Sequence, residues 1–266
     1  MAANEGKTIV KDAAQSRAGS MHPVGLAILV LWLALGTALL AMAEAPHILM
    51  FAFVMVGWLL SVMAHEFGHA LVGYWAGDHT VKDKGYLDFD PRCYADPFIS
   101  LGIPILALAL GGIGFPGGAV YLNTGLMRSR LWRAAASLAG PAVTALIFLG
   151  LALGLNLWAA IMGQAHGDLF PALSVLAFLQ AMALILNLLP IPGLDGFNAV
   201  RPFLPGTWGP GIRKLEGLSL VALLVLVFVI PGASAALFRA AATLSLAAGL
   251  DPTALNYGWK AFHFWQ

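Results

Sequence analysis

The stretch of the sequence best suited to chemistry is a His-Glu-Phe-Gly-His motif at residues 65–69, in an apolar run that begins near Ile48. On a helix, His65 and His69 lie one turn apart on the same face, so both imidazoles can reach one metal ion. Glu66 then sits beside a water held by that metal, where its carboxylate can act as a base. Ionisable groups inside a membrane segment are costly and tend to face a functional cavity, which favours a zinc site over a helix that happens to carry polar residues.

The composition is that of a membrane protein. Hydrophobic residues make up 60% of the 266 residues and charged residues only 10%, against about 25% charged residues in soluble domains. The net charge of +1 gives no case for nucleic acid as a partner. Cys93 is the only cysteine, so an intramolecular disulfide and a thiolate zinc cluster are both excluded, and we expect a bystander thiol in a loop.

Apolar stretches long enough to cross a bilayer recur along the chain. They predict an all-α polytopic membrane protein with about six transmembrane helices, at residues 24–43, 48–75, 131–155, 171–189, 215–231 and 233–250. Lysine and arginine favour the cytoplasmic side, which makes residues 1–22 a cytoplasmic N-terminal tail and places the motif near the cytoplasmic end of its helix. Residues 23–266 then form one membrane-embedded domain with its core at about residues 48–200.

The segment that follows the motif helix is rich in aspartate, and this raises the alternative of a second metal site at Asp78, Asp83, Asp88, Asp90 and Asp96. Lysine and arginine are mixed with these aspartates, a pattern typical of a solvated loop. We therefore expect residues 78–96 to be a solvated cytoplasmic loop.

A zinc enzyme needs a third protein ligand and an open coordination position for water. Asp195 follows a span interrupted by two prolines, and non-helical backbone at membrane depth is tolerated only where it lines a cavity. Aspartate before a glycine is also a common turn residue, so spacing alone leaves both roles open for Asp195. The other histidines lie in predicted loops, turns or tails, where an exposed or structural role is the default: His22, His47, His79, His166 and His263.

Topology supplies a separate test of Asp195. The spans at residues 131–155 and 171–189 are two crossings, which bring Asp195 back to the inner end where the motif lies. A further full crossing at residues 97–115 would move Asp195 roughly 30 Å away. The sequence therefore predicts a re-entrant element at residues 97–122: a broken helix or hairpin followed by a short β-strand near the site, whose edge would bind an extended peptide.

Two motifs together resemble those of the site-2 protease family of intramembrane zinc metalloproteases: the His-Glu-x-x-His helix and the run Asn-Leu-Leu-Pro-Ile-Pro-Gly-Leu-Asp-Gly at residues 187–196. Residues 137–144 are similar to the family's Gly-Pro segment, with Thr144 where the family often has asparagine, a departure that affects only an accessory polar contact. The Gly-Asp-His-Thr stretch after the motif helix is similar to the compact branch that lacks a PDZ domain. The similarity spans about residues 50–200.

The resemblance implies a set of roles for individual residues. Asp195 would be the third ligand beside His65 and His69, holding one Zn²⁺ per chain. Glu66 would be the catalytic base. Asn187 would line the site and hold the substrate backbone or the developing oxyanion.

The function that the resemblance implies is hydrolysis of peptide bonds within or near transmembrane segments, as in regulated intramembrane proteolysis. The expected partners are the lipid bilayer and a transmembrane protein substrate, such as a membrane-bound transcription factor or an anti-sigma factor; nothing in the sequence selects an oligomeric state. The expected location is the bacterial inner membrane, with multiple crossings and the active site toward the cytoplasm.

Two other functional classes would use the same residues. A metal-binding or transporting membrane protein has no need of a carboxylate beside a ligand, and the chain has no evident repeat of the transporter kind, so Glu66 weighs against it. A catalytically inactive membrane scaffold of the same family is disfavoured because the ligands and the base are all present.

Overall fold

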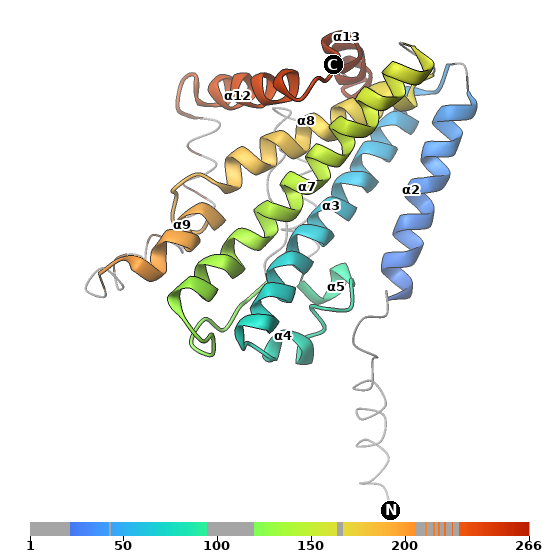
Figure 1. The fold of residues 1–266 in the computed structure, drawn as a ribbon. Helices are drawn as coiled ribbons and strands as arrows, with labels where there is room; N and C mark the ends of the chain where they lie inside the picture. Colours follow the sequence, from blue (N-terminus) through green and yellow to red (C-terminus); the bar gives the residue numbers. More distant parts are fainter. Residues whose placement is uncertain are drawn as a thin grey trace, which may run out of the picture.

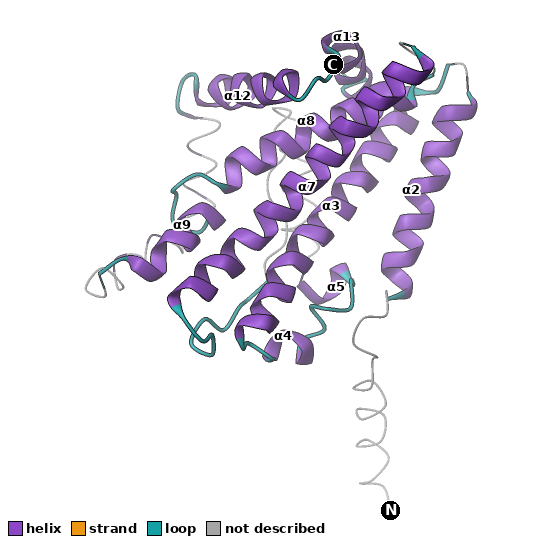
Figure 2. Cartoon of the chain, in the orientation of Figure 1, coloured by secondary structure: helices purple, strands orange, loops and turns teal. Residues whose placement is uncertain are grey.

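The computed structural model describes most of the chain outside the N-terminal tail. The described residues are 22–42, 44–94, 120–163, 167–205 and 229–265, with isolated positions 211, 215, 218, 221 and 225 between them. Nearly all regular structure within these ranges is helical (Figure 2).

Four helices are long and apolar enough to cross a membrane: α2 (Pro23–Ala41), α3 (His47–Ala76), α7 (Arg130–Met162) and α8 (Leu169–Asn187). They match the four predicted spans between residues 24 and 189, although α7 continues seven residues beyond the predicted end at residue 155. The expectation of a helical protein is therefore confirmed, and these four helices are candidate membrane spans among the described residues.

Helices α3, α7 and α8 run side by side, with α2 beside α3 at one edge (Figure 1). The central member is α8, whose apolar window is 78% buried inside the protein, against 17% for α2 and α7. A helix that is apolar on every face can be stable in this central position, because its neighbours cover it all round. The outer faces of α2 and α7 are left for lipid.

The helix ends follow ordinary capping rules, and these rules decide where the motif helix stops. Gly77 adopts φ 115° directly after α3, in the left-handed region that a glycine C-cap provides. At the start of α7, the Ser129 hydroxyl accepts a hydrogen bond from the backbone N–H of Trp132. The end of α3 and the start of α7 thus lie together, and the side chain of Arg128 donates to the carbonyls of Trp75 and Ala76 there.

The prediction of about six transmembrane helices is not confirmed. The predicted span at residues 233–250 is α12 (Ala233–Ala247), which at 15 residues is shorter than the roughly 17–25 residues that a crossing needs. It packs, with α13 (Pro252–Phe262), against the first half of α8 through Phe178, Phe238 and Trp259 (Figure 1). Most of the predicted span at residues 215–231 lies outside the described residues.

The prediction of a solvated aspartate-rich loop is wrong for two of its members. Asp78 is fully buried and accepts hydrogen bonds from the backbone N–H groups of Thr80 at 3.2 Å and Asn123 at 2.6 Å. Asp90 is buried beneath Arg92, whose guanidinium donates to it at 2.8 Å and holds the pKa of this carboxyl below its usual value. Both carboxylates hold the loop in place through hydrogen bonds. Among the described residues of the loop there is no second group that could hold a metal ion.

The loop also contains two single-turn helices, α4 (Thr80–Asp83) and α5 (Pro91–Tyr94), and α5 carries the exposed thiol of Cys93. The cysteine predicted to lie in a loop therefore lies on a helical turn.

Most of the predicted re-entrant element, residues 97–119, lies outside the described residues. The β-strand expected at its end is not formed over residues 120–122, and no strand occurs in the described ranges. The backbone N–H of Val120 donates to a side chain, that of Leu122 to the Val120 carbonyl, and that of Asn123 to Asp78. These donors are satisfied locally or by side chains, so none of them is used in a strand ladder.

Candidate metal centre

Two helices bring the three predicted ligands together. His65 and His69 lie one turn apart on α3, and Asp195 is the first residue of α9 (Asp195–Val200). The Nε2 atoms of the histidines are 3.1 Å apart, and the Asp195 oxygens lie 3.2 Å from His65 Nε2 and 3.4 Å from His69 Nε2. All three ligand atoms lie within 4.8 Å of one another. Asp195 thus lies beside the motif, as the topology argument predicted.

A tight turn after α8 places Asp195. The chain leaves α8 at Asn187, turns through Gly193 at φ 98°, and enters α9 two residues later. A Cβ atom on Gly196 would collide with the backbone of Leu188, so the turn closes only because residue 196 is glycine. The short helix α9 packs on α7. It is followed directly by the 3₁₀-helix η2 (Arg201–Phe203), which also packs on α7.

Helix α7 orients both imidazole rings without contributing a ligand. His69 Nδ1 lies 2.7 Å from the Ala136 carbonyl oxygen, and His65 Nδ1 lies 2.8 Å from the Thr144 hydroxyl. A carbonyl only accepts, so His69 carries its proton on Nδ1 and presents the lone pair of Nε2 to the centre. Gly140, midway between these two residues, has no side chain where the two Nε2 atoms approach α7.

These supporting contacts were only partly anticipated. The sequence placed Thr144 in a Gly-Pro segment and assigned it at most an accessory polar contact. Its hydroxyl instead contacts the ring nitrogen of a ligand, which is the kind of interaction that fixes the tautomer and ring orientation of a metal-binding histidine. The Ala136 carbonyl left no signal in the sequence, because any residue supplies the same backbone atom.

The chemistry of the donor set fits a zinc ion. The Nε2 atoms of the two histidines lie 3.1 Å apart and both lie beside the Asp195 carboxylate, so three atoms that can bind a metal are gathered in one place. Two histidines and one carboxylate are a common catalytic zinc set, and they leave a fourth position open. His65, His69 and Asp195 would therefore hold the ion.

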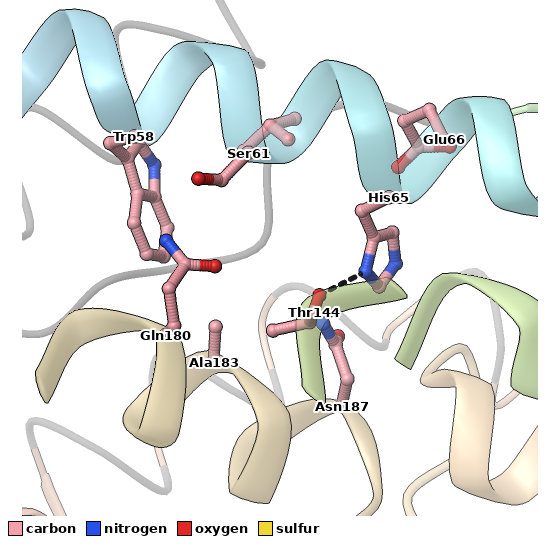
Figure 3. A pocket seen from close by; sticks show the side chains of 9 residues that line it. Trp58, Ser61, His65, Glu66, Thr144, Gln180, Ala183 and Asn187 are labelled. Atoms are coloured by element: carbon pink, nitrogen blue, oxygen red, sulfur yellow. Dashed lines mark hydrogen bonds between the residues drawn. The ribbon is translucent and has the colours of Figure 1, made fainter. Parts of the chain in front are cut away.

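Glu66 and Asn187 border the same centre from two sides. Glu66 is buried, and its Oε2 accepts a hydrogen bond from the backbone N–H of Val120 at 3.0 Å. Asn187, also buried, lines a cavity with His65, Glu66 and Thr144 (Figure 3). The structure thus brings all five predicted site residues into one region.

The remaining histidines in the described part of the chain lie away from the centre. His22 caps α2 through its Nδ1 atom, and His263 lies beside Trp259 on α13. His47 begins α3, at the opposite end of that helix, and His79 contacts the Tyr74 ring edge-on. None of these four joins the ligand group, and His166 lies outside the described residues.

Replacing Thr144 by valine is expected to lower zinc affinity about 10- to 100-fold, because the His65 ring loses the partner that orients it. Competition with a chromogenic chelator measures the affinity. The control is Thr37→Val, which removes an exposed hydroxyl on α2 that bonds only to its own helix. An unchanged affinity in Thr144→Val would mean that the hydroxyl does not support the ligand.

The fold and the ligand group together indicate a membrane protein with a His-His-Asp group that could hold a metal ion. The chain is 51% identical over 154 residues to a protein of Mycolicibacterium smegmatis named putative zinc metalloprotease Rip2, covering 58% of each chain. It is 47% identical over 179 residues to the Mycobacterium tuberculosis protein of the same name, covering 66% of each. A Bacillus subtilis protein named putative zinc metalloprotease YwhC is 28% identical over 191 residues, 67% of this chain and 81% of that protein.

The matched part spans less than two thirds of the length of the mycobacterial relatives. No protein-family model matches the chain, and no solved structure matches it at a significant level. The chain is similar to these proteins named zinc metalloproteases, which is consistent with the site-2 protease resemblance of its two motifs. The relatives' names and the ligand group both imply zinc as the metal.

Proposed function

We propose that the chain is an intramembrane zinc metalloprotease that hydrolyses peptide bonds within or near the transmembrane segments of other membrane proteins. One observation carries the proposal: His65, His69 and a buried glutamate lie on α3, a helix long and apolar enough to cross a membrane, and Asp195 of α9 completes the ligand group beside them. The names of the relatives support a metalloprotease. The position of the group within a bundle of apolar helices supports a substrate that is itself in the membrane.

Zinc, when bound, supplies Lewis-acid chemistry by polarising a peptide carbonyl and making a nearby water more acidic. The protein's own contribution begins at Glu66. Its Oε2 is occupied by the Val120 N–H, and its second oxygen is left to take a proton from the attacking water. The water oxygen bonds to the carbonyl carbon, the C–N bond breaks, and Glu66 returns the proton to the leaving amine.

Asn187 is the residue that we assign to the substrate backbone. It lines the cavity beside His65 and Glu66, and its amide can donate to the oxygen on which negative charge develops. A substrate helix must unwind locally before this contact forms, because helical peptide groups are bonded to each other. The described residues 120–123 supply non-helical backbone beside Glu66.

The orientation in the membrane follows from the basic residues near the metal end of α3. Lys82, Lys84 and Arg92 follow this helix, and Arg128, Arg130 and Arg133 surround the start of α7. Such residues favour the cytoplasmic side. We therefore place the active site toward the cytoplasmic face of the bacterial inner membrane, with a transmembrane protein as the substrate class.

The proposal is tested by comparing wild type with Glu66→Gln, purified in detergent. We expect both to hold about one zinc per chain, since Glu66 is not a ligand. Cleavage of transmembrane reporter helices should fall at least about 100-fold in Glu66→Gln, the loss typical of removing a general base. Zinc is measured by mass spectrometry and cleavage by gel and peptide mass.

Glu44→Gln is the matched control, because Glu44 is exposed in the loop between α2 and α3. It should cleave at the wild-type rate. A wild-type protein without zinc would contradict the metal centre. If Glu66→Gln cleaved as fast as wild type, Glu66 would not be the general base. If zinc-loaded wild type cut none of a varied panel of transmembrane helices, the proposal that the chain is a protease would be wrong.

A further inference from the structure

A cavity extends from the metal centre into the middle of the helix bundle, between α3, α7 and α8. One end is formed by His65 and Glu66, and the other by Trp58, Ser61 and Gln180 (Figure 3). His69 and Asp195 do not line it, so the cavity lies to one side of the ligand group. Trp58, Ser61 and His65 follow one another at intervals of three and four residues along α3, and therefore share one face of that helix.

The far end of this cavity holds two buried donors that lack a partner. Trp58 is 3% exposed and Gln180 is 2% exposed, and neither Trp58 Nε1 nor Gln180 Nε2 makes a hydrogen bond to any described residue. Buried polar groups in proteins are almost always bonded, to protein or to ordered water. Two unsatisfied donors that line the same cavity therefore indicate that something accepts from them there.

The same end of the cavity also contains hydrogen-bond acceptors for a bound molecule. Ser61 Oγ donates to the Gly57 carbonyl at 2.8 Å, which leaves its lone pairs free to accept a hydrogen from a small molecule. The Gln180 amide also carries a carbonyl oxygen, and Figure 3 shows it directed toward the cavity beside Ser61. A molecule at this end can thus both donate and accept.

The size of the cavity decides what the molecule is. Its volume is about 20 Å³, which is room for a single water and too little for a substrate side chain. A buried water needs two to four polar partners, and Trp58, Ser61 and Gln180 supply them.

We propose that Trp58, Ser61 and Gln180 bind an internal water that replenishes the hydrolytic water at Glu66. This role rests on the proposed function, because each peptide bond hydrolysed consumes one water. On its other side Glu66 is bonded to the Val120 backbone, where the substrate segment is expected to lie. A water stored in the cavity reaches Glu66 within the protein, without passing the substrate or the lipid.

The test separates the water site from proteolysis by using two readouts. Radiolytic hydroxyl labelling in ¹⁸O water marks side chains that touch a bound water, even when these are buried. Trp58 is the one buried tryptophan of the described chain, so exposure alone predicts almost no labelling of it. We expect clear ¹⁸O labelling of Trp58 in zinc-loaded wild type and equally in Glu66→Gln, which does not depend on cleavage.

Gln180→Met keeps the length of the side chain but removes its amide. We expect it to lose most of the Trp58 label, to hold about one zinc, and to show kcat lowered about fivefold to tenfold with KM unchanged. Trp58→Phe, which removes the indole N–H together with its five-membered ring, should lower kcat in the same way. Leu184→Met is the control, a volume-conserving change on the same helix outside the cavity, and should match wild type in zinc, kcat and Trp58 labelling.

Unlabelled Trp58 in folded wild type would overturn the water site, whatever the protein cleaves. If Gln180→Met lost the Trp58 label but kept the wild-type kcat, the proposal that this water supplies Glu66 would be wrong. Failure of the protease proposal appears elsewhere, as a zinc-loaded wild type that cleaves no reporter.

Discussion

Replacing Gly140 by alanine is expected to abolish zinc binding and cleavage while the helix bundle stays folded. A Cβ atom at this position would lie 2.5 Å from His65 Nε2 and closer still to His69 Nε2. Both rings would have to swing away from α7, and they would lose the geometry that the ion needs. The helix itself should not suffer, because alanine is the better helix former by about 1 kcal/mol.

Zinc content and circular dichroism measure the two halves of this prediction. Gly150→Ala is the matched control, since Gly150 lies on the same helix and a Cβ there meets nothing within 4 Å. The control should keep about one zinc and full activity. If Gly140→Ala retained wild-type zinc, the close approach of α7 to the two imidazoles would be wrong.

Chelating the zinc is expected to lower the unfolding temperature of wild type but to leave that of Asp195→Asn unchanged. An ion that binds only the folded state stabilises it by about 2.7 kcal/mol at a hundred times its dissociation constant. For a protein of this size that is a shift of roughly 5–10 °C. Asparagine keeps the shape of Asp195 but lacks the negative charge, so the variant should bind little zinc and have none to lose.

Thermal unfolding in detergent, with and without chelator, measures the effect. Asp83→Asn serves as the control, because Asp83 is exposed in α4 and lies outside the ligand group. It should respond to the chelator as wild type does. A chelator-induced shift of equal size in Asp195→Asn would show that the ion binds without Asp195.

The features that the sequence predicted well depend on the geometry of a single helix or on whether the number of membrane crossings is even or odd. The helical repeat alone places His65 and His69 on one face. Counting crossings places Asp195 at the same membrane end, since two full spans return the chain to where it began. Neither inference needs any knowledge of how the helices pack.

The features that were missed depend on packing between distant segments. The contact of Thr144 with His65 arises from the way α7 lies along α3, which no spacing within either helix reveals. Residues 233–250 are apolar enough for a span, but the helix there stops at Ala247 and packs on α8 through aromatic side chains. Val120 and its neighbours have the residue types of a strand, yet their backbone donors bond to side chains or within a turn.

The three points at which α7 meets the histidines recur every four residues: a carbonyl at Ala136, a gap at Gly140 and a hydroxyl at Thr144. One residue inserted between the first and the last would rotate the two parts of the helix by about 100° relative to each other. No single insertion there could keep all three in register with α3. The same insertion after Gly150 would not change the contacts at the centre. We therefore expect insertions and deletions in related proteins to occur after Gly150 and never between Ala136 and Thr144.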